Sequence, residues 1–496
     1  MVFFYNFVYL FITFILLFAA IRLQRHFKKP INHRLPPGPF NFPFIGATHR
    51  MLSSRPAHHT LRQLSAVHGP IMYLRLGEIP TVVISSAEAA KLILKTHDRN
   101  FASRSITISV QIITKGVQDL TFAPYGEFWR QMRRICVVSL LCPKRTRSYK
   151  TIRAEEIHGL LRSIEASCAG GSPDVSINLS EKVALLTNRI TVRAAIGDEG
   201  KIDQDLFLRA LGEVKEAISG FSIADLFPSA PVLATLTGFR RRLQRCHDAV
   251  ERMLDVILEE HRGKTAGDED LLDVLLRCQR DESLPLPISD DNIKGVLNDI
   301  FAGGSETAAT TVEWAMSELI RSLSAMKRAQ MEVREDAAGN NNRLRYMHLI
   351  IKETLRLHPP VPLLLPRECH KTCEVMGYEI PERTRVMVNV WAIGRDPKYW
   401  EEPEAFKPER FENNVRELGG ADFELLPFGA GRRMCPGVSF GLEMVEIALA
   451  NLLYYFDWEY SKVGDDELNM SENFGVTVGR KFPLHLRASQ RFPIIH

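Results

Sequence analysis

The segment Phe428-Gly-Ala-Gly-Arg-Arg-Met-Cys-Pro-Gly437 is the most informative part of this 496-residue chain. It places one cysteine, Cys435, in a glycine-rich loop. Glycine accepts positive φ angles and close approach of other groups, so such a loop can aim backbone N–H groups at a sulfur. Arg433 can neutralise a carboxylate, and Phe428 can lie flat against a large planar ligand. The segment therefore predicts a thiolate that binds iron in a planar cofactor.

A long helix is predicted from Ser289 to about Ser322, with Ser289 as its N-cap. Its apolar side chains recur at helical spacing, as expected for one buried face. The centre reads Ala302-Gly-Gly-Ser-Glu-Thr-Ala308, where each of the two glycines costs about 1 kcal/mol of helix stability. A flat cofactor that presses on this face would require them. Glu306 and Thr307 then supply an acid and a hydroxyl that can pass protons through water.

Two more pairs of side chains carry a helical spacing. Glu353 and Arg356 stand three residues apart and can form an ion pair. Such pairs are common on exposed helices, so only the order of the surrounding motifs makes this one specific. Trp129 and Arg133 stand four residues apart and share a helix face. Read alone, they indicate a buried tryptophan beside a surface arginine.

The signals for β-strands are short. Ile71–Leu76 and Thr81–Ser85 predict two strands around a turn, and Glu374–Val390 predicts a hairpin. Residues 150–285 are predicted to be helical, with surface loops between the helices. The chain shows no internal repeat and no segment of low complexity.

These motifs, in this order, resemble the cytochrome P450 family over nearly the whole chain. The family signature Phe-x-x-Gly-x-Arg-x-Cys-x-Gly is matched at every position from Phe428 to Gly437. The resemblance is strongest to plant-type microsomal members, within the branch rich in terpene hydroxylases. It implies a mostly α-helical fold with small β-sheets and haem b with Cys435 as the axial ligand of its iron. It also implies dioxygen as a substrate and NADPH-derived electrons from a membrane-bound NADPH–cytochrome reductase.

The same resemblance implies roles for further residues. Glu306 and Thr307 are the expected catalytic pair. The residues expected to contact the haem, besides Cys435, are Trp129, Arg133, Arg367, Arg433, Phe428 and Gly429. A buried charge network beneath the haem loop is expected from Glu353, Arg356 and Arg410. The expected substrate pocket has small or branched apolar side chains at Ile106, Ile300, Ala302, Val361, Leu364 and Val476. Such a pocket suits a compact, rigid hydrocarbon.

The N-terminus is predicted to be a membrane anchor. Residues 1–21 contain no charged side chain, and about 20 apolar residues span a bilayer as a helix. Arg22, Arg25, Lys28 and Lys29 follow, which places the rest of the chain in the cytosol. A cleaved signal peptide would have a basic start and a shorter apolar core. We therefore expect a single-pass anchor with its basic flank over residues 1–29, in contact with lipid of the endoplasmic reticulum membrane, and a catalytic domain over residues 30–496.

Composition excludes several classes of protein. The net charge of +4 is too small to indicate a nucleic-acid partner. The eight cysteines lack the CxxC spacing of zinc sites, and the chain is too large to be a disulfide scaffold. One cysteine is therefore expected to be functional and seven to be reduced. Around residues 337–346 the chain is shorter than the family pattern, which puts the local folding there in doubt.

The sequence thus predicts an NADPH- and dioxygen-dependent monooxygenase that acts on a small apolar specialised metabolite, first of all a sesqui-, di- or monoterpene. An alkaloid or another apolar metabolite is the alternative substrate. A haem-thiolate isomerase or dehydratase would need no reductase, but such relatives usually lack the Glu306–Thr307 pair. A haem-binding protein without catalytic activity is the third alternative.

Overall fold

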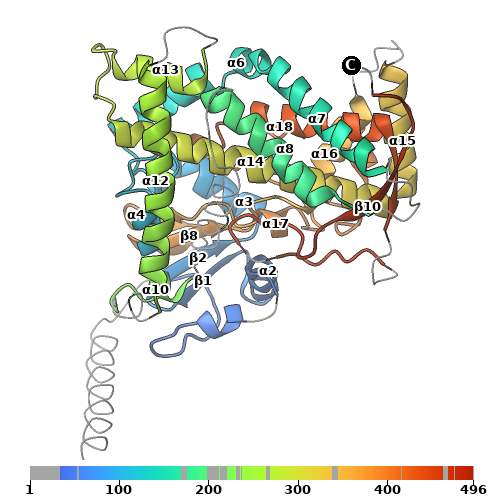
Figure 1. Ribbon diagram of the computed structural model, residues 1–496. Helices are drawn as coiled ribbons and strands as arrows, with labels where there is room; N and C mark the ends of the chain where they lie inside the picture. Colours follow the sequence, from blue (N-terminus) through green and yellow to red (C-terminus); the bar gives the residue numbers. More distant parts are fainter. Residues whose placement is uncertain are drawn as a thin grey trace, which may run out of the picture.

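The structure is a computed structural model. The residues that it describes are 34–52, 55–168, 176–197, 212, 221–230, 235, 237–263, 269–337, 344–414, 416–461, 467–473 and 475–494. Within them the expected mostly helical fold with small sheets is confirmed (Figure 1). The expected anchor and most of the shortened region around residue 340 lie outside the described residues.

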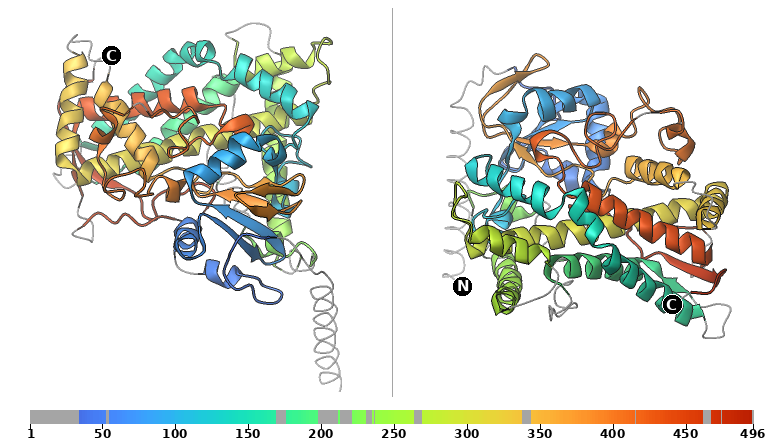
Figure 2. Two further views of the ribbon diagram at one scale, coloured as in Figure 1. Left: turned by 180° about the vertical axis from the view of Figure 1, so that it is seen from behind. Right: turned by 90° about the horizontal axis from the view of Figure 1, so that it is seen from above.

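The long central helix forms as predicted. Helix α14 (Asp290–Arg321) has 32 residues, so it is about 48 Å long. Ser289 and Asn292 form a capping box, because each side chain accepts a hydrogen bond from the other residue's backbone N–H. Figures 1 and 2 show α14 passing through the middle of the helical part. It packs on α8 (Leu179–Ile196), α16 (Arg345–Leu357) and α18 (Val438–Tyr455).

The other helices surround this centre. Their bounds are α2 (Ala57–His68), α3 (Ala87–Lys91), α4 (Ile108–Ile113), α5 (Glu127–Ile135), α6 (Pro143–Ser148), α7 (Lys150–Cys168), α10 (Ile223–Leu226), α12 (Phe239–Gly263), α13 (Leu271–Gln279), α15 (Leu323–Glu335) and α17 (Val390–Ile393). Among the described helices, only α18 is long and apolar enough to cross a membrane. Its Met444, Leu449 and Leu452 are fully buried in the main hydrophobic core, so its apolar character is explained by packing inside the protein.

The largest sheet has five strands in the order β1-β2-β8-β5-β3. Their bounds are β1 (Ile71–Leu76), β2 (Ile79–Ile84), β3 (Ser103–Arg104), β5 (Arg367–Glu368) and β8 (Arg385–Val388). Strands β1 and β2 form the predicted antiparallel pair. The predicted hairpin at residues 374–390 is only partly correct. Strands β6 (Cys373–Val375) and β7 (Tyr378–Ile380) form a hairpin, whereas β8 leaves it and pairs in parallel with β2.

A third sheet has the order β4-β10-β9 and joins distant parts of the chain. Its strands are β4 (Ile177–Asn178), β9 (Phe456–Tyr460) and β10 (His485–Gln490). The view from above in Figure 2 shows the five-stranded sheet on one side of the helical layer. Strands β3 and β5 of that sheet carry Arg104 and Arg367 to the boundary between sheet and helices, where the candidate site lies.

Candidate active site

A cavity of about 300 Å³ lies between α14 and the loop that precedes α18. The wall formed by α14 includes Ile300, Gly303, Thr307 and Thr311. Because these residues recur every three or four positions, they form one face of the helix. The opposite wall is formed by residues 427–437 and the first turns of α18. Most of the remaining lining is apolar.

Cys435 faces this cavity from the loop. The backbone N–H of Gly437 donates to the Cys435 sulfur at 3.3 Å, and the N–H of Cys435 donates to the Phe428 carbonyl at 3.0 Å. Gly431 has φ +71°, and a Cβ atom there would lie 2.1 Å from the Leu94 carbonyl oxygen. Only glycine therefore fits at this position. Burial raises the pKa of the Cys435 thiol, while the Gly437 N–H and the charge of Arg133 oppose the shift.

Four arginines and one carboxylate give the cavity a positive edge. The arginines are Arg104, Arg133, Arg367 and Arg433, and the carboxylate is Asp299. Burial and the neighbouring charge of Arg367 lower the pKa of Arg433 to about 9. Buried guanidinium groups that repel one another are stabilised by a ligand with carboxylates. A thiol on one wall and an anion-binding edge match haem, which has an iron and two propionates, so the residues fit this cofactor.

The expected haem contacts are brought together at this edge. Arg433 donates to the carbonyl oxygens of Ala102 at 2.7 Å and Leu120 at 3.2 Å. Its guanidinium carbon lies 4.4 Å from the ring centre of Trp129, whose indole N–H also donates to Leu120. Arg367 donates to Asp98 at 3.1 Å. Trp129, Arg133, Arg367, Phe428, Gly429, Arg433 and Cys435 all line the one cavity.

Sequence reasoning missed two residues of this site. Arg104 donates to the carbonyl oxygen of Leu365 at 2.7 Å, and no local motif marks it. Asp299 accepts from the backbone N–H groups of Leu120 at 2.8 Å and Thr121 at 3.0 Å. It stands eight residues before Thr307, on the same face of α14, so its helical spacing could have identified it.

The centre of α14 differs in part from expectation. The Thr307 hydroxyl lines the cavity and donates to the Gly303 carbonyl at 2.7 Å. Glu306, its neighbour, is partly buried and is not among the residues that line the cavity. A Cβ atom at Gly303 would meet nothing within 4 Å, whereas one at Gly304 would lie 2.9 Å from Thr191 on α8. A flat cofactor was expected to require both glycines, but close packing against α8 explains Gly304.

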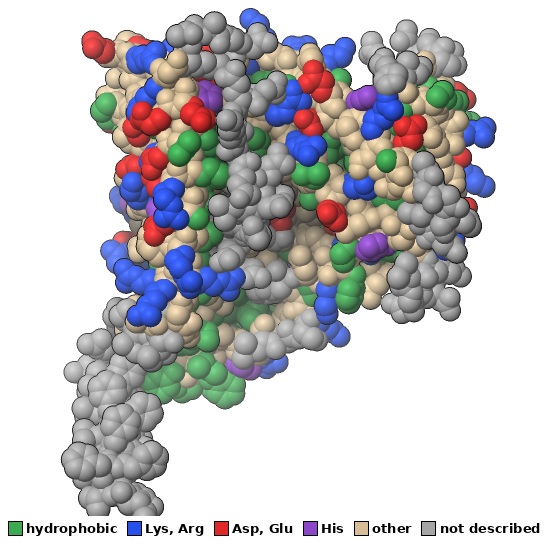
Figure 3. Space-filling model, viewed as in Figure 1, with side chains coloured by type: hydrophobic (Ala, Val, Ile, Leu, Met, Phe, Trp, Pro, Cys, Tyr) green, Lys and Arg blue, Asp and Glu red, His purple; other side chains and the backbone are tan. Residues whose placement is uncertain are grey.

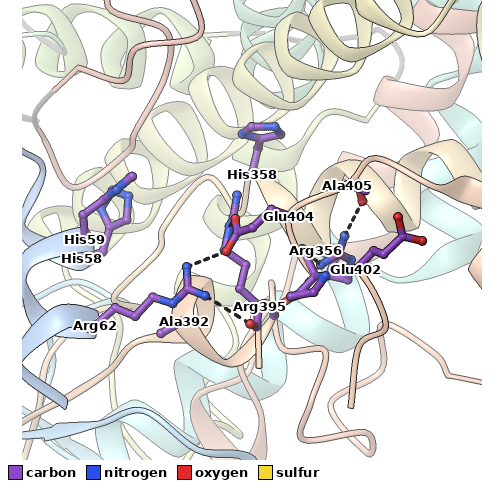
Figure 4. A network of polar contacts seen from close by, with 12 residues as sticks. His58, His59, Arg62, Arg356, His358, Ala392, Arg395, Glu402, Glu404 and Ala405 are labelled. Carbon is purple, nitrogen blue, oxygen red and sulfur yellow. Dashed lines mark hydrogen bonds and ion pairs between the residues drawn. The ribbon is translucent and has the colours of Figure 1, made fainter. Parts of the chain in front are cut away.

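The expected charge network is present and buried. Arg356 makes two hydrogen bonds of 2.7 Å to Glu353, and Arg410 donates to the same carboxylate at 3.0 Å. Arg356 also donates to backbone carbonyls, including that of Ala405 at 3.1 Å. Figure 4 shows Arg356 directed at Ala405, while Arg62 is directed at Glu404 and at the backbone of Arg395. These contacts tie α16 to the segment before the cysteine loop.

Of the six expected substrate-pocket residues, three line the cavity, one lines a neighbouring pocket and two line neither. Ile300, Val361 and Leu364 line the cavity. Val476 lines a smaller pocket, of about 30 Å³, which shares Leu364 with the cavity. Ile106 and Ala302 are not among the residues that line the cavity, and Ala302 lies on a different face of α14 from Ile300 and Gly303. The structure therefore does not bring these two residues together with Ile300, Val361 and Leu364, and their role stays a prediction.

Comparisons with known proteins agree with this geometry. The family model described as Cytochrome P450 matches residues 36–485. The chain is 46% identical to the desmethyl-deoxy-podophyllotoxin synthase of Sinopodophyllum hexandrum, over 95% of this chain and 94% of that protein. It is 43% identical to the 5-epiaristolochene 1,3-dihydroxylase of Nicotiana tabacum, over 98% of each chain. A solved structure of a zebra fish cytochrome P450 with progesterone has a TM-score of 0.75 at 25% identity, and covers 88% of this chain and 100% of that chain.

Proposed function

Because this chain belongs to the cytochrome P450 family, and is therefore a haem-thiolate monooxygenase that uses dioxygen and electrons from a reductase, we propose that it oxidises a small terpenoid. The observation that carries this proposal is the apolar wall of the cavity, formed by Val296, Ile300, Val361 and Leu364. Branched aliphatic side chains suit a rigid hydrocarbon, which needs few polar contacts. The relative from Nicotiana tabacum, whose name describes dihydroxylation of 5-epiaristolochene, supports the same class.

A second substrate class has support of its own. The relative that is 46% identical is named as a podophyllotoxin-type synthase, and the alignment covers nearly all of both chains. Another apolar specialised metabolite, including an alkaloid, is therefore the alternative. Asp299 favours such a substrate if it carries a hydrogen-bond donor, because this is the one carboxylate among the residues that line the cavity.

The residues have the following proposed roles. Cys435 supplies the thiolate ligand, and the Gly437 N–H stabilises its negative charge. Arg104, Arg133, Arg367 and Arg433 would hold the two propionates, and Trp129 would pack beside them, since its indole N–H already donates to the Leu120 carbonyl. Haem, when bound, activates dioxygen and transfers one oxygen atom to the substrate.

Protons reach the site through α14 in this proposal. Thr307 holds its hydroxyl at the cavity wall by donating to the Gly303 carbonyl, which leaves its oxygen able to accept a hydrogen bond from water. Glu306 is the next residue on α14 and does not line the cavity, so its proposed part is to exchange protons with water beside the cavity, from which they pass to the water at Thr307. The apolar wall around Ile300 and Val361 excludes other water, so protons arrive by this route.

We also propose that one face of the protein rests on the endoplasmic reticulum membrane. Phe40, Phe42 and Ile45 are 70%, 47% and 42% exposed, and Ile223 is 57% exposed. Figure 3 shows hydrophobic side chains gathered on the lower face of the molecule. Large apolar side chains that gather on a surface mark contact with lipid or protein. Residues 1–29 would anchor this face, and residues 30–496 would form the catalytic domain in the cytosol.

The proposed function is tested in microsomes that contain the full chain and a reductase. They are supplied with NADPH and a panel of terpenes, podophyllotoxin-type compounds and alkaloids, and products are identified by mass spectrometry. A terpene product one oxygen atom heavier supports the proposal, and a Cys435→Ala control should give none. Oxidation of only a podophyllotoxin-type compound or an alkaloid would assign the alternative class. Conversion of a hydroperoxide without NADPH would instead indicate an isomerase or dehydratase.

A further inference from the structure

Cys369 and Cys373 flank a short turn between β5 and β6, outside the cavity. Cys369 is fully buried, and Cys373 is partly exposed. All eight cysteines of the chain are free thiols. The two side chains interact with each other directly.

The turn is held in place by Asn100. The Asn100 side-chain amide donates to the Lys371 carbonyl at 2.7 Å and to the Cys369 sulfur at 3.6 Å. The Lys371 N–H donates back to the Asn100 side-chain oxygen at 2.9 Å. These reciprocal contacts fix the backbone between the two cysteines, so the thiols stay near each other.

The sheet register gives independent evidence that the two cysteines lie beside the same residue. Cys373 on β6 is directly opposite Ile380 on β7, and the Cys369 sulfur lies 3.6 Å from the Ile380 carbonyl oxygen. Residues directly opposite in an antiparallel pair have Cα atoms about 4.5–5.5 Å apart. Both cysteines therefore adjoin Ile380, one through its strand pairing and the other through its sulfur, and this places their side chains in the same small region.

The two thiols differ in reactivity. The interaction with Cys369 lowers the pKa of the Cys373 thiol to about 7. The same interaction, together with burial, raises the pKa of Cys369. The thiolate, which is the nucleophilic form, is therefore more populated at Cys373 than at Cys369 near neutral pH. By contrast, burial raises the pKa of the partly exposed Cys278.

We propose that Cys373 and Cys369 form an oxidative modification site at which hydrogen peroxide converts two thiols into a disulfide. The Cys373 sulfur attacks one oxygen of hydrogen peroxide, the O–O bond breaks, and a sulfenic acid and water form. The Cys369 sulfur then attacks the Cys373 sulfur, the S–S bond forms, the S–O bond breaks, and a second water leaves with the Cys369 proton. Two electrons pass from the two sulfurs to one peroxide, and such a low-pKa thiol beside a resolving cysteine is typical of redox-sensitive proteins.

The disulfide would stiffen the chain next to Arg367, which lines the cavity. Cys369 stands two residues after Arg367 on the same stretch of chain. Arg367 donates to Asp98 and to the Phe101 carbonyl, on the short helical turn that also carries Asn100. Closing the turn at Cys369 would stiffen this assembly, so we expect slower amide exchange in residues 98–101 after oxidation.

The test uses the reduced full-length holoenzyme, titrated with hydrogen peroxide, alkylated and digested with trypsin. Trypsin cleaves after Lys371, between the two cysteines, so the disulfide joins the peptides Glu368–Lys371 and Thr372–Arg383. We expect this linked species, two hydrogen atoms lighter than its parts, at peroxide concentrations at least about tenfold lower than those that oxidise Cys278, because Cys373 has the larger thiolate fraction.

Two variants make the result specific. Cys369→Ser should leave Cys373 as a sulfenic acid that a cyclic dione traps, and no linked peptides should form. Cys278→Ser should leave the linked species unchanged. Circular dichroism establishes that each variant is folded. The proposal is overturned if Cys373 remains fully alkylated after peroxide treatment, or if the wild type gives Cys373 sulfinic acid without the linked peptides.

Discussion

Glu353 and Arg356 make two hydrogen bonds of 2.7 Å to each other, and neither side chain has exposed surface. Arg410 donates to the same carboxylate at 3.0 Å. Loss of one partner from a buried charge network leaves a charge without compensation, which costs about 3–5 kcal/mol. We therefore expect Glu353→Gln to lower the free energy of unfolding by about this amount, measured by urea denaturation followed by circular dichroism.

The matched control for this network is an exposed pair. Arg328 and Glu412 are 45% and 40% exposed and lie 2.7 Å apart. Such pairs contribute about 0–1 kcal/mol, so Glu412→Gln should change stability little. If Glu353→Gln and Glu412→Gln have equal effects, the network beneath the cysteine loop is not a source of stability.

The identity of the iron ligand is tested within one cavity, because two cysteines line it. Cys435→Ala should abolish the carbon monoxide difference spectrum of thiolate-ligated haem, and turnover with it. Cys136 lines the same cavity, but burial raises the pKa of its thiol to about 12. Cys136→Ala should keep both the spectrum and the activity. The reverse pattern would move the proposed ligand from Cys435 to Cys136.

The Thr307 hydroxyl is expected to matter for proton delivery and not for binding. Thr307→Ala should continue to consume NADPH, while product formed per NADPH falls roughly tenfold, because positioned proton donors contribute factors of this size or more. Ser167→Ala is the control, since the Ser167 hydroxyl donates in the same way to the Ser163 carbonyl on the exposed helix α7. Unchanged product per NADPH in Thr307→Ala would exclude the proposed relay.

Asp299 should give folding a pH dependence. Burial raises the pKa of its carboxyl to about 6. Hydrogen bonds from Thr121 and Leu120 act in the opposite direction but are outweighed by burial. A free aspartate has a pKa of about 3.9. Because the folded state binds this proton more tightly, the carboxyl stabilises the fold most below about pH 4, and this contribution is lost as the pH rises through about 6.

The variant Asp299→Asn removes that titration. We expect its melting temperature to fall less than that of the wild type when the pH is raised from about 4.5 to about 6.5. Glu282→Gln, at an exposed position on the loop after α13, is the control and should follow the wild type. Parallel curves for wild type and Asp299→Asn would show that this carboxyl does not titrate in the range.

Local patterns in the sequence were sufficient to predict some elements of this structure. The cap at Ser289 and the helical period predicted α14, because capping and amphipathic packing act within a few residues. The order of motifs predicted that Trp129 and Cys435 meet in one site, and they line one cavity. That prediction came from resemblance to a family and not from spacing, since about 300 residues separate the two.

Long-range pairing could not be predicted in this way. Strand β8 was predicted as part of a local hairpin, but its four residues are all buried and its partner β2 lies about 300 residues earlier, so nothing local to β8 specifies the pairing. Arg104 and Asp299 line the same cavity for a similar reason, through tertiary packing that no local pattern records. Helix phase explains why Ala302 is not among the residues that line the cavity, because adjacent helix positions differ by about 100° and Ile300 and Gly303 define the cavity face.

The two central glycines of α14 are expected to respond differently to alanine. At Gly303 a methyl group would meet nothing within 4 Å, and alanine favours a helix over glycine by about 1 kcal/mol. Gly303→Ala should therefore keep or raise the melting temperature. Since Gly303 lines the cavity, the added methyl group should weaken the spectral response to substrate. A lower melting temperature would mean that Gly303 has a packing contact of its own.

At Gly304 the methyl group would lie 2.9 Å from the Thr191 methyl carbon and 3.2 Å from its hydroxyl oxygen. Thr191 is buried and β-branched, so its side chain cannot rotate away easily, and overpacking of this kind costs about 1–3 kcal/mol. We expect Gly304→Ala to lower the free energy of unfolding by about that amount, less the gain in helix propensity. Thr191→Ser removes the methyl group and keeps the hydroxyl that donates to the Thr187 carbonyl. The double variant should regain most of the loss, and a purely additive cycle would show that Gly304 is required by something other than Thr191.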